Sequence, residues 1–160
     1  MIYIGIDNGV TGSIGIIGDR TSEFYHTPVK NELSYTKAKK WIDRIDSIML
    51  KKMLKDLIDV KIIALERPMV DPRKFAATQS AMRALEATLV IIEDLKLPYR
   101  YIDSKEWQRE MLPSGLKGPE LKKASLDIGK RLFPQHAAFF KADADGILIA
   151  EYLRRTDAPQ

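Results

Sequence analysis

The chain has 160 residues, 45% of them hydrophobic and 30% charged, which is the composition of an ordinary soluble globular protein. It contains no cysteine, and His26 and His136 are its only histidines, so disulfides, thiolate metal sites and zinc sites built on several imidazoles are excluded, and any metal must be held by oxygen ligands. The net charge of +4 is mild evidence for a polyanionic partner, and no apolar run reaches the roughly 18 residues of a membrane span.

The first part of the chain predicts a meander of three strands followed by a helix. Apolar segments at 2–7 and 13–18 flank the turn NGVTG, and a third, edge strand over 22–28 would stop at Pro28. From 34 to about 57 the apolar residues recur at spacings of three and four, which predicts a helix. These apolar residues are Trp41, Ile45, Ile48, Met49, Met53, Leu54 and Leu57.

The rest of the chain alternates strands and helices. A near-continuous apolar run predicts a buried strand at 60–66, and another short strand is expected at 99–103. The periodicity predicts a long helix over 74–95. Three further helices are expected at 105–112, 119–133 and 145–155. The element order predicts one domain over 1–160, with a mixed five-stranded sheet of a three-strand antiparallel meander plus parallel strands, and helices on both faces.

Acidic residues stand where strands end and where the last helix begins. Asp7 ends the first strand, Glu66 ends the strand at 60–66, and Asp143 and Asp145 precede the apolar helix ILIAEYL. Ligands of open α/β sheets bind beyond the carboxyl ends of the parallel strands, where these acids would meet. Converging carboxylates repel one another unless cations neutralise them, and two metal ions about 3.5–4 Å apart can activate water and stabilise the leaving oxygen of a phosphodiester.

Each acid taken alone also has a simpler interpretation. Asp7 could be a turn residue, Glu66 could pair with the neighbouring Arg67, and Asp143 and Asp145 could be helix caps. It is their order along the chain that favours a metal site.

Four segments together resemble a known family. IGIDNGVTGSIGII, ALERP, KKASLDIGKRLFP and ADGILIAEYL, in this order and spacing, resemble the RuvC-type Holliday junction resolvases, especially their phage branch, over residues 2 to about 153. The resemblance implies a ribonuclease-H-like fold and a homodimer. It further implies an enzyme that cuts branched DNA, chiefly four-way junctions, with Mg²⁺ or Mn²⁺ held by four acidic residues.

The resemblance assigns three acids and leaves the fourth open. Asp7, Glu66 and Asp145 match the family's motifs, although Gly146 replaces the usual alanine. The family commonly places its fourth acid, or a histidine, where this chain has Ala142. Asp143 is the nearest candidate, and Lys141 could instead contact the scissile phosphate.

A role for each acid follows from two-metal chemistry. We hypothesise that Asp7 bridges both ions, that Glu66 binds one of them, and that Asp143 and Asp145 bind the other. No covalent enzyme intermediate is then needed.

Cations near these acids are candidates for phosphate contacts. The segment GLKGPELKK is the strongest, because its glycines let the backbone approach a phosphate. Phe75 could wedge or stack at an opened junction, or it could belong to the core. The candidate DNA-binding residues are Arg67, Arg73, Lys74, Phe75, Lys105, Lys117, Lys122, Lys123 and Lys141.

The expected partners are branched DNA and a second copy of the chain, because a junction of near two-fold symmetry needs two symmetric cuts. The helix over 74–95 is the expected dimer surface, although its apolar residues could all be intramolecular core. We expect a cytoplasmic protein, since the N-terminus enters a strand pattern without a signal sequence.

Three other functions remain open. A resolvase-like nuclease acting on structured or precursor RNA is the nearest. An actin-like ATPase shares the phosphate-cradling hairpin type of DNGVTG, but 160 residues are too few for its two duplicated halves. A catalytically inactive binding module is disfavoured by the retained acids.

Overall fold

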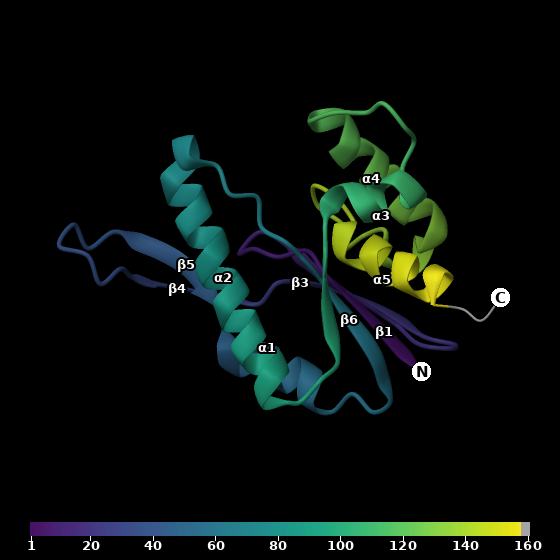
Figure 1. Cartoon of the computed structure of the whole chain (residues 1–160), viewed down its shortest axis with the longest axis horizontal. Coiled ribbons are helices and arrows are strands. Elements are labelled where there is room, and N and C mark those ends of the chain that lie inside the picture. The colour runs from purple at the N-terminus through teal and green to yellow at the C-terminus, as the bar shows by residue number, and fades with distance from the viewer. Residues whose placement is uncertain (158–160) are drawn as a thin grey trace.

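The computed structural model describes residues 1–157 and builds them around a mixed sheet of five strands (Figure 1). These strands are β1 (Ile2–Ile6), β2 (Ser13–Ile17), β3 (Ser22–His26), β6 (Val60–Glu66) and β7 (Tyr99–Ile102). They lie in the order β3-β2-β1-β6-β7. The pairs β1–β2 and β2–β3 are antiparallel, whereas β1–β6 and β6–β7 are parallel. The predicted mixed sheet is confirmed.

Helices cover both faces of this sheet, as predicted (Figure 1). One face carries α1 (Ser47–Lys55) and α2 (Phe75–Asp94), and the other carries α3 (Ser104–Met111), α4 (Pro119–Leu132) and α5 (Asp145–Thr156). Short 3₁₀ turns occupy Pro72–Lys74 and Pro134–His136. Alternate side chains of β1 enter different cores, because successive residues of a strand point to opposite faces: Tyr3 packs on the α5 side and Ile4 on the α2 side.

The single helix expected over 34–57 is wrong. The structure has a two-stranded antiparallel ribbon of β4 (Val29–Leu33) and β5 (Trp41–Ile45), and a helix begins only at Ser47. We call this hairpin the β4–β5 ribbon; it projects from the sheet beside α2 (Figure 1). Trp41 and Ile45 lie four residues apart, and this spacing puts two side chains on the same face of either a helix or a strand.

Helix α5 lies across β1 and β2 at unusually close range, because glycines remove the side chains between them. A Cβ on Gly5 would collide with the carbonyl oxygen of Gly146 and the amide nitrogen of Ala150. A Cβ on Gly146 would lie 2.6 Å from the carbonyl carbon and oxygen of Ser13. The alanine that the resemblance leads one to expect at 146 therefore does not fit, and glycine fixes the start of α5 directly on the sheet.

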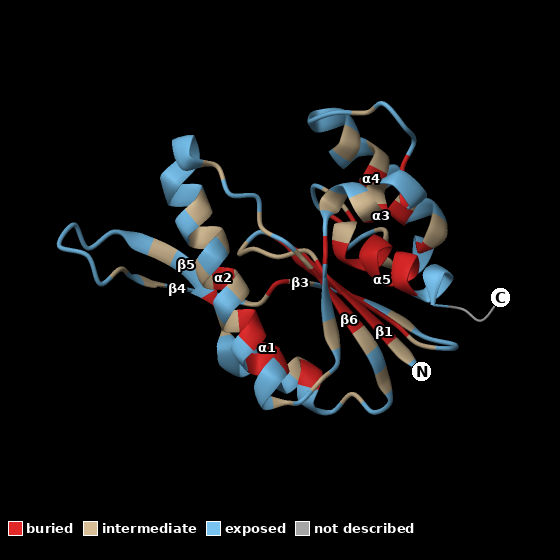
Figure 2. Cartoon of the chain, viewed as in Figure 1, coloured by how far each residue is buried: buried red, intermediate tan, exposed pale blue. Residues whose placement is uncertain are grey.

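Burial follows the two cores and leaves the outlying elements exposed (Figure 2). Residues 146–153 of α5 are all buried, while the ribbon and the half of α2 that begins at Phe75 are mostly exposed. No helix among residues 1–157 is long and apolar enough to cross a membrane.

Candidate active site

The four predicted acids converge at one edge of the sheet. Asp7 follows β1 and Glu66 ends β6, and these two strands are adjacent and parallel, so their carboxyl ends meet. Asp145 is the first residue of α5, and Asp143 lies in the segment leading into it. One carboxylate oxygen from each of Asp7, Asp143 and Asp145 falls within a set whose members are all within 4.8 Å of one another.

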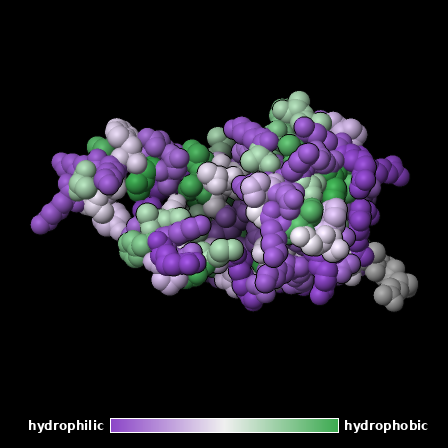
Figure 3. Space-filling model, turned by 90° about the horizontal axis from the view of Figure 1, so that it is seen from above, coloured by the Kyte–Doolittle hydropathy of each residue, from purple (hydrophilic) through white to green (hydrophobic). Residues whose placement is uncertain are grey.

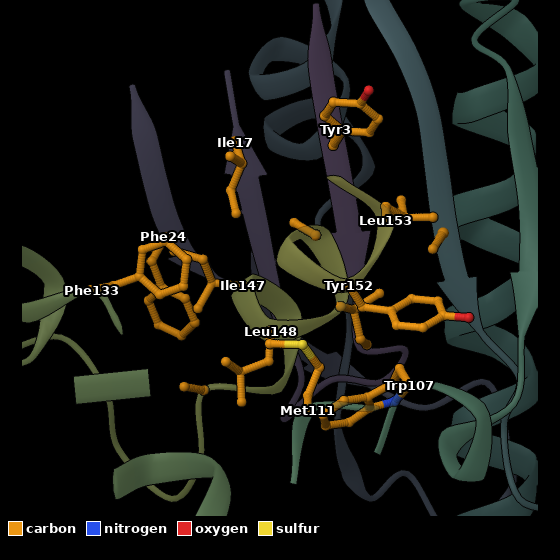
Figure 4. Packing of buried hydrophobic residues seen from close by; sticks show 14 of the residues in the cluster. Tyr3, Ile17, Phe24, Trp107, Met111, Phe133, Ile147, Leu148, Tyr152 and Leu153 are labelled. Carbon is orange, nitrogen blue, oxygen red and sulfur yellow. The ribbon is translucent and has the colours of Figure 1, made fainter. Parts of the chain in front are cut away.

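Glu66 is not in that closest set, and its carboxylate is held from the other side. The indole nitrogen Nε1 of Trp107 donates a hydrogen bond of 3.0 Å to Glu66 Oε1. Trp107 is fully buried in α3, in the core on the α5 side, where it packs among residues such as Met111 and Leu148 (Figure 4). This bond fixes one oxygen of Glu66 at the edge of the cluster.

The carboxylate of Asp145 is positioned by a buried serine of α4. The Ser125 hydroxyl donates to Asp145 Oδ1 and accepts a hydrogen bond of 3.0 Å from the backbone N–H of Ala144. On the other side of the helix start, the Gly146 N–H donates to the Ser13 hydroxyl, also at 3.0 Å. The start of α5 is thus bonded to both α4 and β2, which leaves its acid little freedom to move.

Crowding and burial make these acids weak ones. Burial is the first cause that raises the pKa of Asp7 well above its usual value, and repulsion from Glu66 and then Asp145 adds to it. Burial also raises the pKa of Glu66, against the Trp107 hydrogen bond, which lowers it. Burial and the charge of Asp143 raise the pKa of Asp145 to about 7. These carboxyl groups therefore tend to keep their protons unless a cation neutralises their charges.

This donor set fits a divalent metal ion. All four groups are carboxylates, the hard oxygen ligands that Mg²⁺ and Mn²⁺ prefer. Their only cationic neighbour at contact distance is Lys122 of α4, among the residues the structure describes, whose Nζ lies 3.7 Å from Asp143 Oδ2. One exposed lysine does not balance four acids, so the site has a deficit of positive charge.

The acids open onto a cleft of about 420 Å³ between the sheet edge, α2 and α3. Its walls include Asp7, Glu66 and Asp145, together with the cations Arg67 and Lys74. Asp143 instead faces a neighbouring hollow of about 320 Å³, which Lys141 also lines. Acids and basic residues thus share one surface.

The predicted DNA-binding residues lie at different distances from this surface. Lys122 contacts an acid, and Arg67, Lys74 and Lys141 line the two hollows, as described above. Arg73 is exposed and pairs with Asp71 at 3.1 Å. Phe75 is 72% exposed, so its alternative as a core residue is wrong. Lys105, Lys117 and Lys123 are exposed but line neither hollow.

The structure also tests the simpler interpretations of the acids. Arg67 pairs with Asp103 at 3.1 Å rather than with Glu66. Ala144 occupies the N-cap of α5, and Asp143 only accepts a long bond of 3.4 Å from the backbone N–H of Asp145. Neither interpretation accounts for three half-buried carboxyl groups that lie this close to one another.

Sequence reasoning missed the residues that hold the acids. Ser125 lies within the KKASL segment and Trp107 within KEWQREM, but their bonds depend on how α3 and α4 pack against the sheet. Asn8 was missed as well. Its Nδ2 donates to the Ala81 carbonyl of α2 at 3.1 Å, while its buried Oδ1 has no protein partner in the described chain. The position of Asn8, a polar residue directly after Asp7, was the only feature of the sequence that pointed to it.

Comparison with known proteins assigns the fold. No protein-family model matches the chain, and no curated protein matches its sequence significantly. The structure is similar to that of Thermus thermophilus RuvC in complex with a Holliday junction substrate, with a TM-score of 0.60, 13% identity and coverage of 98% of this chain and 96% of that one. A second Thermus thermophilus RuvC structure gives a TM-score of 0.60 and 15% identity over 98% of this chain and 97% of that one.

The fold is therefore of the ribonuclease-H-like class. The strand order and the helices on both faces of the sheet agree with this class. Within that class it is the RuvC-type fold, and the match extends over nearly the whole of both chains. The resemblance first noted in four short segments is thus supported by the arrangement of the entire structure.

Proposed function

We propose that the chain is a structure-selective endonuclease that resolves branched DNA, chiefly Holliday junctions, by symmetric, divalent-metal-dependent phosphodiester hydrolysis. The observation that carries this proposal is the convergence of Asp7, Glu66, Asp143 and Asp145 at the carboxyl edge of a RuvC-type sheet. A structural neighbour is a RuvC bound to a Holliday junction, and this supports branched DNA as the substrate class.

Each acid has a role that its position supports. Asp7 would bridge two ions, because its carboxylate lies within 4.8 Å of those of Asp143 and Asp145 and its strand is adjacent to the one that ends at Glu66. Glu66 would hold one ion, and Asp143 and Asp145 would hold the other. Two Mg²⁺ or Mn²⁺ ions there would lower the pKa of a bound water and stabilise the departing 3′ oxygen.

The cations would hold and orient the DNA. Lys122 pairs with Asp143 and Lys141 lines the same hollow as Asp143, so both would contact the phosphate next to the cut. Arg67, Arg73 and Lys74 flank the cleft, and Lys105, Lys117 and Lys123 would extend the phosphate track over α3 and α4. Lys117 stands between Gly115 and Gly118, whose φ angles of 82° and 51° favour glycine and keep the backbone bare for a phosphate.

Two further features suit a branched substrate. Phe75 stands exposed at the start of α2, close in the chain to the cleft-lining Lys74, and we propose it as the side chain that inserts among bases at the junction centre. The half of α2 that begins there extends beyond the sheet with exposed residues such as Met82 (Figure 2). We propose this helix as the surface for a second copy, which would supply the second cut.

The test uses a four-way junction, a fork and a plain duplex of equal length, with Mg²⁺ or Mn²⁺, and compares wild type with Asp7→Asn. We expect paired, symmetric cuts in the junction, weaker cleavage of the fork and almost none of the duplex. Equal cleavage of all three would contradict junction selectivity, and full activity of the variant would contradict the metal assignment.

Two controls separate the remaining alternatives. A structured RNA of the same length tests the precursor-RNA nuclease, which would cut RNA in preference to the junction. Light scattering at micromolar concentration tests the dimer, since a monomer that still makes paired cuts would rule out the proposed second copy.

A further inference from the structure

The tip of the β4–β5 ribbon, residues 34–40, is basic and aromatic. Its charged residues are Lys37, Lys39 and Lys40, all exposed, and it contains no acid. Among residues 1–157 none of the three lysines forms an ion pair with a carboxylate at contact distance. Tyr35 stands 81% exposed beside them. The tip therefore carries three closely spaced positive charges, and the ring of Tyr35 beside them is exposed to solvent.

A second aromatic lies at the base of the tip. Trp41 pairs across the ribbon with Leu33, and both remain exposed, Trp41 to 66%. Tryptophan and tyrosine normally bury most of their surface, and large exposed apolar surfaces usually mark binding sites. In the space-filling view from above, the end of the molecule that carries the ribbon shows strongly hydrophilic groups interspersed with hydrophobic ones (Figure 3).

A cleft of about 440 Å³ separates the ribbon from α2. Tyr35 and Lys40 line it from the ribbon, and Gln79 and Arg83 line it from α2. Val10, in the turn after Asp7, lines this cleft and also the hollow that holds Asp143 and Lys141. The surface therefore continues from the acidic site, across the turn that follows β1, to the ribbon.

We propose that the ribbon tip and the side of α2 that bears Gln79 and Arg83 form a second DNA-binding surface, which holds an unpaired DNA strand outside the acidic site. The contact with a second copy proposed above then uses the neighbouring side of α2, around Met82. The lysines would contact phosphates, and Tyr35 and Trp41 would stack on bases, the two means by which proteins hold single strands. This inference rests on the proposed function. It assigns part of the recognition of branched DNA to the ribbon, which carries none of the four clustered acids.

DNA fits this surface better than a second copy of the chain does. Two ribbon tips with three unpaired lysines each would repel one another in a symmetric contact. Lysine is also depleted from the centres of protein interfaces. A polyanion, in contrast, gains from every one of these charges and releases its own counterions.

The first test measures binding of a labelled four-way junction in the Asp7→Asn background, without divalent metal. Lys37→Ala with Lys40→Ala should lower the slope of log K against log salt by about 2 and weaken binding about tenfold near 0.1 M salt. Lys52→Ala with Lys55→Ala on α1 is the matched control, since it also removes two exposed lysines. Equal effects of the two pairs would overturn the proposal.

The second test uses the tryptophans, of which Trp41 is 66% exposed and Trp107 fully buried. Acrylamide should therefore quench mainly Trp41, and a bound junction or a short single strand should protect it. Trp41→Phe leaves Trp107 alone and should abolish the change. Tyr35→Ala should weaken single-strand binding at least about fivefold, and Tyr35→Phe should retain it.

The outcomes separate this inference from the proposed function. Junction cleavage with an unprotected Trp41 would overturn the ribbon surface while leaving the nuclease intact. Equal protection by duplex and single strand would overturn the stacking contact. A change of oligomeric state in the lysine variant, with DNA binding unaltered, would assign the ribbon to a contact between copies and overturn the proposal. Absence of any junction binding or cleavage by wild type would instead contradict the proposed function.

Discussion

The two sides of the sheet are built on opposite principles. On the α5 side, glycines bring the helix onto the strands, and hydrogen bonds from Ser125 and Ser13 fix its first turn. On the α2 side, the β4–β5 ribbon stands away from the sheet with aromatic and basic residues in solvent. The first arrangement suits chemistry, which needs carboxylates held in place against their repulsion. The second suits a long, flexible polyanion, which needs charge and reach rather than rigidity.

The largest expected effect falls on the rigid side. Asp145→Asn should lower single-turnover cleavage of a four-way junction by at least about 10³-fold, because it would remove one of the proposed metal ligands. Lys37→Ala, on the ribbon, should slow cleavage at saturating protein by less than about threefold. A large loss in both variants would mean that the two regions are not functionally distinct.

The two tryptophans offer the same contrast in stability. Trp107→Ala should lower the free energy of unfolding by about 3–5 kcal/mol, since it empties a buried position and frees a Glu66 oxygen. Trp41→Ala should cost less than about 1 kcal/mol, because the side chain is largely in solvent already. Urea denaturation followed by circular dichroism would measure both, and similar losses would contradict the assigned burial.

The acid cluster should give stability an inverse dependence on pH when metal is absent. The raised pKa values of Asp7, Glu66 and Asp145 mean that the folded state holds more protons than the unfolded one above about pH 4, so stability falls as pH rises. A pKa of about 7 for Asp145 corresponds to a loss of about 2–3 kcal/mol between pH 5 and 8.

Thermal unfolding in EDTA across that range would measure this loss. Mg²⁺ or Mn²⁺ should restore stability at pH 8 more than at pH 5, and Asp145→Asn should flatten the profile. The carboxylates with lowered pKa values, Glu32, Asp71 and Glu151, titrate below this range and do not mask the trend. A metal-free protein that is more stable at pH 8 would contradict the proposed crowding.

Among the residues at the acidic site, the smallest effect is expected for the serine that bonds Asp145. Ser125→Ala removes the hydroxyl that bonds both the carboxylate and the Ala144 N–H, and it should weaken Mn²⁺ binding by about 10- to 100-fold. Isothermal titration with Mn²⁺ would measure this. Ser80→Ala, in the cleft beneath the ribbon, is the control and should leave Mn²⁺ affinity unchanged.

Prediction from sequence succeeded where local patterns and geometry agree. Asp7 and Glu66 end apolar strands, and neighbouring parallel strands must bring such ends together, so both acids could be placed on one edge. The buried helix after Asp145 was equally clear, because its apolar residues leave no doubt about which element they form. Asp143 also lies in the cluster, although the family resemblance places its fourth acid one residue earlier, at Ala142.

Prediction failed where the same residues fit two periods. Trp41, Ile45 and Ile48 satisfy a helix, whereas VKNEL and WIDRI pair as strands with Val29 opposite Ile45. Asp46 was the missed signal, since it caps α1 by accepting a 3.0 Å bond from the Met49 N–H. The bonds of Ser125 and Trp107 could not be read from sequence at all, because they depend on the packing of separate helices.

The ribbon leaves and rejoins the domain at a single point. Its first and last residues, Val29 and Ile45, face each other, and the Asp46 N–H donates to the Pro28 carbonyl at 2.8 Å. Because the two ends of the ribbon already contact each other, the ribbon can be removed without separating the segments that it connects. Replacing residues 30–44 by a two-residue Asn-Gly turn should leave the sheet and acids intact. Such a shortened chain would show which DNA the rest of the domain binds without the ribbon, and the excised ribbon could be transplanted to a related scaffold.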